Sequence, residues 1–414
     1  MTGATGTARA AGLISRTRVL PVGPDPLALL GEDGFAFSHE GREMATSGVA
    51  ARITVDGGER RFQRAAADAE DVLSGIEVDD PLELPGTGPI AVGALPFASG
   101  VQGELIVPSV VVGRTRRGLA WITEVGGGHG EPGPERWPDS GTGGRPDPQL
   151  AQGRRQWDEA VIEALRRIRA GRLEKVVLAR EVIVEGDSAF DRCGLLARLR
   201  QDNPSCFTFA SGPFVGSSPE LLARRRGNRV VSRPMAGSAG RAATAAVDER
   251  LIAELLSSDK ELAEHRVVVD AVRAALEPVC TEVFNRAPEV VQLTTVAHLA
   301  TTVGGWLRRP APTALAVAGL LHPTPAVAGA PRAAALATIA ELEPFDRGQY
   351  GGPVGWVDSR GDGDWAVALR CARLDGATAR LVAGAGIVAG SDPQDEWDET
   401  QAKLQTMLRA LAGA

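Results

Sequence analysis

The sequence predicts an α+β fold in which mainly antiparallel sheets are flanked by helices. The 414 residues are 43% apolar, which is ample for a large packed core. Runs of strand-forming residues are mixed with several helical segments, and hairpin turns outnumber helical crossovers. That pattern is typical of antiparallel sheets and not of a doubly wound parallel sheet.

Composition excludes several classes of protein. The net charge of −7 shows no excess of basic residues, so no nucleic-acid partner is expected. No run of 18 apolar residues occurs, and the N-terminus lacks an apolar segment after a basic start, so neither a membrane span nor a signal peptide is expected. The four cysteines form no CxxC or CxxH pattern, which favours free thiols and a cytoplasmic location.

The first 125 residues read as short strands separated by glycine and proline. We expect them at 52–55, 90–95, 104–112 and 119–125. The Gly/Pro-rich stretch 126–148 predicts a loop or linker, either a surface loop within one domain or a domain boundary.

The pattern is stronger in the remainder of the chain. Trp157, Val161, Leu165 and Ile168 recur at helical spacing, and Gly171 is a suitable stop. Further helices are expected around 195–199, on both sides of a break at 257–259, at 313–321 and 333–343, and from Asp392 or Asp395 to about 411. Strands are expected at 174–184, 206–211, 290–293, 296–303, 355–358, 365–374 and 379–388, with hairpin turns at 227–228 and 375–376.

Two helices carry carboxylates on one face. Glu261 and Glu264 are three residues apart, and Glu396, Glu399 and Lys403 follow at i, i+3 and i+7. Such pairs could converge on a hard cation such as Mg²⁺, which takes one or two carboxylates and keeps several waters. The alternative is a solvated acidic face, with Glu399 and Lys403 as an ordinary surface pair.

Basic residues offer two candidates for chemistry. Only three of the 45 basic residues are lysines, and Lys175 lies in a strongly apolar strand segment. Loss of solvation there favours the neutral amine and makes Lys175 a candidate base, since arginine cannot lose its proton. The alternative is a lysine that reaches to solvent from the start of a strand. Arg370 has apolar neighbours and needs an anionic partner, either a structural carboxylate or a ligand.

Glu220 and a pair of glycines are weaker candidates. Glu220 follows Pro219 and opens a strand, where a lone glutamate is usually exposed. Gly384 and Gly386 interrupt a strand, so their backbone N–H groups could face an anion, or they could mark a bulge. The sequence contains no GKS/T phosphate loop and no Gly-x-Ser-x-Gly elbow.

Taken together, these segments resemble the chorismate-utilising enzymes, and among them the isochorismate synthases most closely. The resemblance covers about residues 150–410, with all segments in family order. They are LEKVVLARE (173–181), FVGSSPELL (214–222), SRPMAGSAGR (232–241), DKELAEHRVVVD (259–270), HLATTVGG (298–305), LHPTPAVAGAPR (321–332), ELEPFDRGQYGGPVGW (341–356), ALRCARLDG (368–376) and AGAGIVAGSDPQDEWDET (383–400), followed by Lys403.

The resemblance implies a four-layer α/β/β/α fold with two large, mainly antiparallel sheets packed together. It implies one chorismate-binding domain over 1–414, with a variable N-terminal part at 1–148 and a catalytic core at 149–414. The implied activity is Mg²⁺-dependent conversion of chorismate to isochorismate for siderophore, salicylate or menaquinone biosynthesis. Members are often monomers, so a cytoplasmic monomer is expected.

It also implies residue roles. Lys175 matches the base that activates water, and Glu220 matches the acid that protonates the departing C4 hydroxyl. Glu264 and Glu399 match the Mg²⁺ ligands, with Glu261 and Glu396 as neighbouring carboxylates. The residues that match positions around the substrate are Gly237, Ser238, His298, Ala326, Tyr350, Arg370, Gly384, Gly386 and Lys403.

The segment 324–332 indicates which branch of the family the chain resembles. Ala326 stands where ammonia-using members and salicylate synthases tend to carry Ser or Thr, and Arg332 replaces the lysine typical of the amidotransferase-linked members. These residues favour isochorismate synthase. The alternatives are a salicylate synthase, which adds pyruvate elimination, and an anthranilate or aminodeoxychorismate synthase component.

Overall fold

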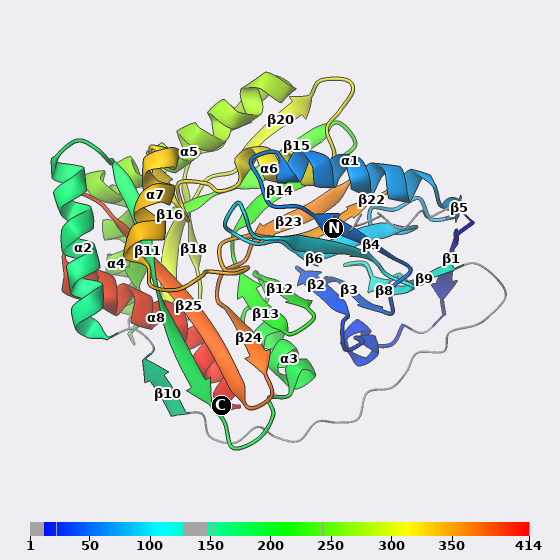
Figure 1. Cartoon of the computed structure of the whole chain (residues 1–414), viewed down its shortest axis with the longest axis horizontal. Coiled ribbons are helices and arrows are strands. Elements are labelled where there is room, and N and C mark those ends of the chain that lie inside the picture. Colours follow the sequence, from blue (N-terminus) through cyan, green and yellow to red (C-terminus); the bar gives the residue numbers. More distant parts are fainter. Residues whose placement is uncertain (1–11, 22, 127–146, 151–152, 242–243, 414) are drawn as a thin grey trace, which may run out of the picture.

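The computed structural model describes residues 12–21, 23–126, 147–150, 153–241 and 244–413. Within them the strands form two large sheets and one small one (Figure 1). Every strand pair in these ranges is antiparallel except β1 (Ile14–Leu20) beside β5 (Glu77–Asp79). The predicted antiparallel character is therefore confirmed.

The larger sheet takes strands from both ends of the chain. Its order is β10 (Asp147–Leu150), β11 (Lys175–Glu185), β25 (Thr378–Ile387), β24 (Cys371–Asp375), β13 (Phe214–Ser218), β12 (Phe207–Ser211), β2 (Phe35–His39), β3 (Arg42–Ser47), β8 (Val110–Arg114), β9 (Ala120–Gly126), β1 and β5. The short β21 (Gly329–Ala330) pairs with the start of β11.

The second sheet has the order β17 (Cys280–Asn285), β20 (Val303–Leu307), β15 (Arg229–Arg233), β14 (Leu221–Arg226), β23 (Gly363–Val367), β22 (Pro353–Asp358), β6 (Ile90–Ala94), β7 (Gly103–Val107) and β4 (Ala51–Val55). The small sheet consists of β16 (Met235–Gly240), β19 (Val296–Ala300) and β18 (Glu289–Gln292).

Helices flank both large sheets. They are α1 (Arg61–Ser74), α2 (Arg154–Arg169), α3 (Arg192–Asp202), α4 (Ala245–Ser257), α5 (Asp259–Leu276), α6 (Ala314–Leu321), α7 (Arg332–Leu342) and α8 (Pro393–Ala412), with short 3₁₀ turns at Pro26–Leu29 and Glu277–Val279.

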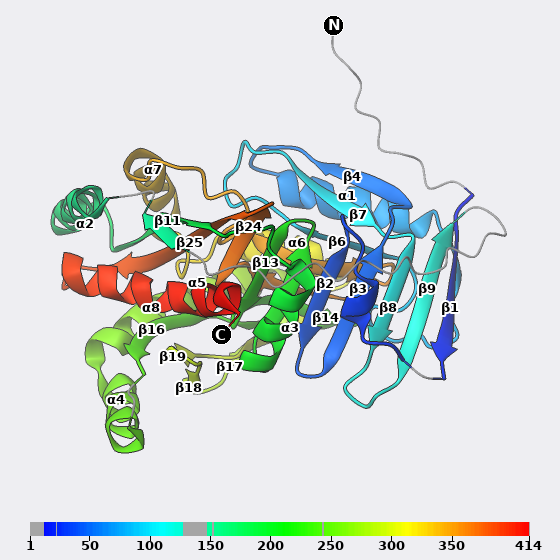
Figure 2. The same cartoon turned by 90° about the horizontal axis from the view of Figure 1, so that it is seen from below.

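The packing gives four layers. Phe37 and Phe209 of the larger sheet share one apolar core with Leu221 and Trp356 of the second sheet. Helices α1 and α6 pack on the second sheet, while α3 and α8 cover the larger one through a separate core that includes Leu404 (Figure 2). This helix–sheet–sheet–helix order agrees with the expected fold.

Polar side chains or a glycine mark several helix ends. The Ser258 side chain accepts a hydrogen bond from the Glu261 N–H at the start of α5, and Thr313 caps α6 in the same way. Asp392, rather than Asp395, caps α8. Gly171 follows α2 with a φ of +70°, which only glycine adopts at little cost.

The expected ranges omit the strands β1, β2, β3, β5, β10, β13, β16, β17 and β21 and the helix α1. Helix α1 lies where only strands were predicted, although Phe62, Ala65, Ala69 and Val72 are buried at helical spacing. Half of its buried apolar residues are alanine, so the periodic signal is weak. Strand β17 was also missed, because most of its side chains are at least partly exposed.

Three predicted strands were wrong in extent, because each is two strands. The run 104–112 divides into β7 and β8, 296–303 into β19 and β20, and 365–374 into β23 and β24. In all three cases the halves belong to different sheets. Each break is only two or three residues long, at 108–109, 301–302 and 368–370, so the pattern along the run did not reveal it.

Most of the Gly/Pro-rich stretch 126–148 lies outside the described residues. Its ends do not form a loop, since Gly126 closes β9 and residues 147–148 begin β10, which pairs with β11. In the described part of the chain, no helix is long and apolar enough to cross a membrane, and all four cysteines are free.

Candidate active site

One cavity of about 420 Å³ gathers side chains from β11, β16, β19, β25, α5 and α8. All fifteen residues singled out by the sequence line it: Lys175, Glu220, Gly237, Ser238, Glu261, Glu264, His298, Ala326, Tyr350, Arg370, Gly384, Gly386, Glu396, Glu399 and Lys403. The structure thus brings together residues that lie up to 228 positions apart in the sequence, from Lys175 to Lys403.

Lys175 is the first residue of β11 and is 3% exposed. Its Nζ lies 2.6 Å from Oε1 of Glu264 on α5. The side chain therefore does not reach solvent from the strand start. Lys175 is therefore paired with a carboxylate, and it can act as a base only in its neutral form.

Glu220 immediately precedes β14 and is also 3% exposed, contrary to the exposure typical of a lone glutamate there. Burial raises the pKa of this carboxyl to about 8, although the positive charge of Arg370 opposes the shift. Glu220 is thus mostly protonated at neutral pH and can donate a proton.

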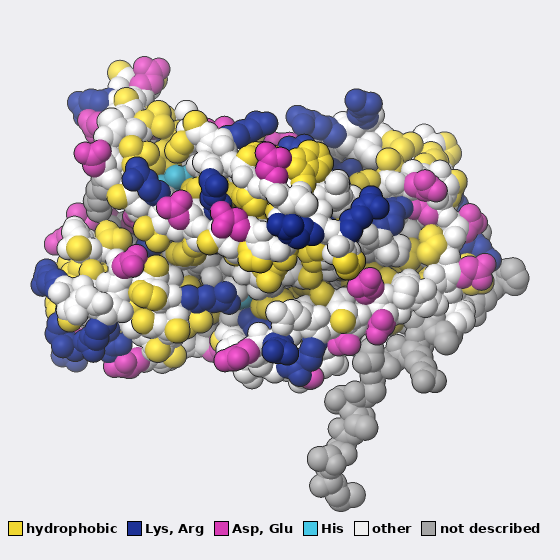
Figure 3. All heavy atoms as spheres, turned by 90° about the horizontal axis from the view of Figure 1, so that it is seen from above, with side chains coloured by type: hydrophobic (Ala, Val, Ile, Leu, Met, Phe, Trp, Pro, Cys, Tyr) yellow, Lys and Arg dark blue, Asp and Glu magenta, His cyan; other side chains and the backbone are white. Residues whose placement is uncertain are grey.

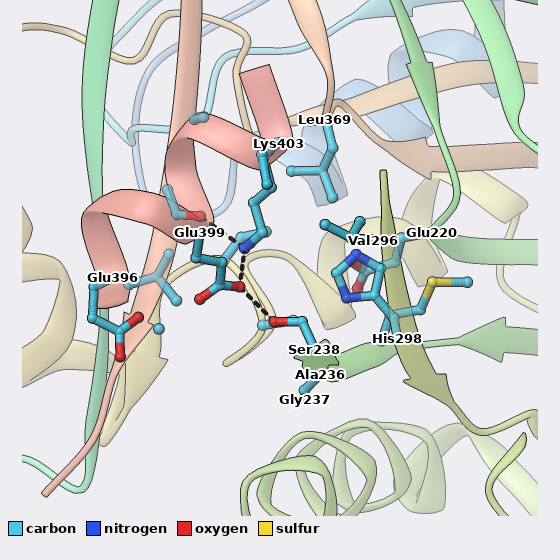
Figure 4. A pocket seen from close by; sticks show the side chains of 18 of the residues that line it. Glu220, Ala236, Gly237, Ser238, Val296, His298, Leu369, Glu396, Glu399 and Lys403 are labelled. Atoms are coloured by element: carbon cyan, nitrogen blue, oxygen red, sulfur yellow. Dashed lines mark hydrogen bonds and ion pairs between the residues drawn. The ribbon is translucent and has the colours of Figure 1, made fainter. Parts of the chain in front are cut away.

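The Glu399 carboxylate of α8 is held by one cation and one hydroxyl (Figure 4). Oε1 of Glu399 accepts from Nζ of Lys403 at 2.7 Å and from Oγ of Ser238 at 2.6 Å. Burial opposes ionisation of Glu399, but Lys403 and Ser238 lower its pKa to about 2. Burial and the adjacent negative charge of Glu399 raise the pKa of Glu396 to about 8.

Ser238 connects the two acidic helices. While its hydroxyl bonds Glu399 on α8, its backbone N–H donates to Oε2 of Glu261 on α5 at 3.1 Å. The side chains of Glu399 and Lys403 are 24% and 15% exposed, so they are a pair within the cavity wall and not an ordinary surface pair. The two predicted acidic faces therefore do converge.

Two glycines of the cavity wall lie close to its carboxylates. A Cβ added to Gly386 would lie 2.9 Å from Cε of Lys175 and 3.2 Å from Oε1 of Glu264. A Cβ on Gly237 would lie 3.2 Å from Oε2 of Glu261. Both glycines keep space beside the carboxylates. Across the described ranges, no three His, Cys, Asp or Glu side chains lie close enough together to form a complete metal site by themselves.

One edge of β25 opens to the cavity. Strand β24 pairs with β25 only as far as Val382, and β11 covers the other edge. The Gly384 carbonyl accepts from Nζ of Lys403 at 2.9 Å, on the side away from β11. Because N–H and C=O of one strand residue point to the same side, the Gly384 N–H faces the cavity.

Arg370 was expected within a strand, but it lies in the crossing between β23 and β24. Its backbone has a φ of +45°, an uncommon value for a side-chain-bearing residue that is typical of constrained functional positions. Nη2 lies 2.8 Å from Nε2 of His298, and the buried Nε has no hydrogen-bond partner in the described part of the chain. No described carboxylate forms an ion pair with Arg370, which favours a ligand as its anionic partner.

The other polar groups beside Arg370 are neutral. Burial, followed by the charge of Arg370, lowers the pKa of His298 to about 3. Burial raises the pKa of Tyr350 to about 12, so its hydroxyl remains a hydrogen-bond donor. The arrangement presents one cation and neutral donors, which suits a carboxylate.

The apolar part of the wall was not predicted from the sequence. Met235, Val296 and Leu369 line the cavity beside the polar residues. Val296 lies two positions before His298 on β19, and Leu369 precedes Arg370. Strand alternation from His298 would have identified Val296, but nothing in the sequence distinguished Met235 from core residues.

Comparisons with known proteins identify the family of this chain. Residues 145–412 match the family described as chorismate binding enzyme. Isochorismate synthase DhbC of Bacillus subtilis is 40% identical over 335 residues, covering 78% of this chain and 81% of the relative. Isochorismate synthase EntC of Escherichia coli is 35% identical over 398 residues, covering 93% and 96%. The crystal structure of a putative 2,3-dihydroxybenzoate-specific isochorismate synthase, DhbC from Bacillus anthracis, matches with a TM-score of 0.79 and 34% identity, covering 94% of this chain and 99% of that one.

Proposed function

Since this chain belongs to the family of chorismate-binding enzymes, we propose that it is an isochorismate synthase, an isomerase that converts chorismate to isochorismate. The observation that carries the proposal is the buried, protonated Glu220 in one cavity with Lys175 and the unpaired Arg370. A proton donor, a potential base and a carboxylate-binding cation are the groups that this reaction needs.

In the proposed reaction, water attacks C2 of chorismate as the C4 hydroxyl leaves and the double bonds move. Glu220 donates its proton to the departing hydroxyl, which leaves as water. Lys175, in its neutral form, accepts a proton from the attacking water. One water is added and one is lost, so the product is an isomer of the substrate. A lysine suits the base because an arginine would stay charged.

We assign the substrate carboxylates to the polar wall around Arg370. Its orphaned Nε and the neutral Tyr350 hydroxyl can donate to an enolpyruvyl carboxylate. The free N–H groups on the exposed edge of β25, at Gly384 and Gly386, add backbone donors. His298 and Ala326 would then lie beside the ring.

We further propose that the enzyme uses Mg²⁺, held by Glu264 and Glu399 with Glu261 and Glu396 beside them. These four carboxylates share one wall with Asp395 and Asp398, and burial together with the charge of Glu399 raises the pKa of Glu396. The space left by Gly237 and Gly386 adjoins Glu261 and Glu264. Because Mg²⁺ takes only one or two carboxylates and keeps water ligands, the wall fits it without a ready-made group of three. When bound, the ion supplies positive charge that offsets the carboxylates and the substrate dianion.

We also propose that the enzyme works as a cytoplasmic monomer. Every group in the proposed reaction comes from one chain, and the four free cysteines suit a reducing compartment.

The test is to incubate the purified protein with chorismate and Mg²⁺ and to separate the products by chromatography. Isochorismate alone is expected. Salicylate with pyruvate would indicate a salicylate synthase instead, and an aminated product formed only with ammonia would indicate an anthranilate-type enzyme. Unchanged chorismate would refute all three activities. A parallel reaction with EDTA should lose turnover and regain it with excess Mg²⁺ if the metal assignment is right.

A further inference from the structure

A second cavity, of about 650 Å³, lies between α1, α6 and α7 and shares no residue with the active-site cavity. We propose that it is an effector site for a small amphipathic carboxylate, with an aromatic body and one negative charge, and that its occupancy adjusts the active site. The volume falls within the range of small-molecule sites. On the face seen in Figure 3, hydrophobic and basic side chains border a hollow.

The body of the ligand is inferred from the apolar part of this cavity. Phe62 of α1, Phe97, Leu336 and Ile339 of α7, and Phe345 line it. Phe62 and Phe97 are 7% and 4% exposed, so these buried rings form a rigid base for the cavity. Aromatic side chains favour a flat, apolar ligand body through offset or edge contacts.

The charge of the ligand is inferred from two arginines. Arg61 donates to the carbonyl oxygens of Pro96 and Phe97 at 2.8 Å, and also to that of Ala98. Arg332, at the first position of α7, donates to the carbonyl oxygen of His322. Neither forms an ion pair with a described carboxylate. The N-terminus of α7 adds a positive partial charge on the same side.

The acidic residues around the cavity do not neutralise these arginines. Glu343 is bound by Arg347 at 2.5 Å, while Glu59 and Asp346 are exposed. Burial, followed by the charge of Arg332, lowers the pKa of Arg61 to about 10. A single carboxylate would offset that charge.

The wall between the two cavities connects them. Arg347, which lines the second cavity, donates to the carbonyl oxygens of Val177 and Val327 at 2.8 Å each. Val177 and Val327 both line the active site. Oε1 of Glu343 accepts from the Ala179 N–H at 2.8 Å, so the Glu343–Arg347 pair also fixes β11 beyond Lys175. A ligand against Arg347 would therefore act on the backbone that positions Lys175.

The probe is 1-naphthoate, titrated into the full-length protein by isothermal calorimetry, with neutral 1-naphthalenemethanol as the uncharged comparison. We expect naphthoate to bind at least tenfold more tightly than the alcohol, and Arg332→Gln to weaken naphthoate about tenfold or more. Arg169→Gln removes the same charge from an exposed position outside the cavity, and it should leave the affinity unchanged.

Arg370→Gln separates the two cavities. Naphthoate affinity should survive this change, because Arg370 lines only the active site. Affinity lost in Arg370→Gln but kept in Arg332→Gln would place the ligand in the active site and overturn the proposal, as would no binding at millimolar concentration. In steady-state assays, naphthoate should change kcat in wild type and not in Arg332→Gln. Binding without any change in kcat or KM would refute the effector role.

Discussion

Replacing Glu220 by glutamine should change how stability depends on pH. Glutamine has nearly the same shape and keeps an acceptor for the Met235 backbone N–H, but it cannot ionise. In wild type, burial raises the pKa of Glu220 from 4.5 to about 8. Between these values the carboxyl is protonated in the folded chain and ionised in the unfolded chain. The folded state then binds more protons, so wild-type stability falls as pH rises through this window.

The magnitude follows from the shift. Each pH unit between the two pKa values changes the free energy of unfolding by about 1.4 kcal/mol. From pH 5 to pH 8, wild type should lose roughly 3 kcal/mol relative to Glu220→Gln. His298 and Glu396 also titrate abnormally, but both variants share their contributions, so the difference isolates Glu220.

Urea denaturation of substrate-free protein at pH 5, 6, 7 and 8 measures this difference. Glu185→Gln, an exposed glutamate at the end of β11, is the matched control and should run parallel to wild type. Parallel curves for Glu220→Gln as well would show that Glu220 is ionised in the folded enzyme and would refute its role as acid. The same variant should lose about 10²- to 10⁴-fold in kcat.

The remaining predictions concern the other groups of the cavity. Lys175→Arg should abolish turnover nearly as fully as Lys175→Ala, since both remove a group that can accept a proton; chorismate turnover near the wild-type rate in Lys175→Arg would contradict the assigned base. Gly386→Ala should lower kcat by tenfold or more because its Cβ would meet Lys175 and Glu264, whereas Gly390→Ala meets no atom within 4 Å and should be close to silent in the same assay. Ser238→Ala removes the hydroxyl that orients Glu399, so the Mg²⁺ concentration for half-maximal activity should rise about tenfold. Ser257→Ala, on exposed α4, is its control, and equal Mg²⁺ dependence of the two variants would count against the metal assignment.

The residues of the site were easier to predict from the sequence than the packing of the elements that carry them. Glu261, Glu264, Glu396 and Glu399 could be grouped from spacing, because helical periodicity fixes which side chains share a face. That Ser238 would join the two faces could not be read from spacing, because it depends on how β16 docks between α5 and α8. The resemblance to a family placed Ser238 near the site but did not predict its bonds.

Burial was the property that was hardest to predict from the sequence. Glu220 reads as an exposed residue at a strand start, and only tertiary packing makes it a buried acid. Lys175 reads correctly as buried, yet its partner Glu264 lies 89 residues further along the chain. The local sequence pattern indicates the secondary structure and hydropathy of a segment. The charge state of a side chain depends instead on which residues, often distant in the sequence, pack against it.

The position of Arg370 has a mechanical consequence. The chain leaves the second large sheet at the end of β23 and enters the first at β24, and Arg370 lies in the three residues between them. An anion bound to Arg370 would therefore restrain the segment that connects the two sheets. Movement of one sheet relative to the other would break the contact with the anion, so a bound substrate opposes such movement. Amide hydrogens of β23 and β24 should consequently exchange more slowly with solvent, and in concert, when the cavity is filled.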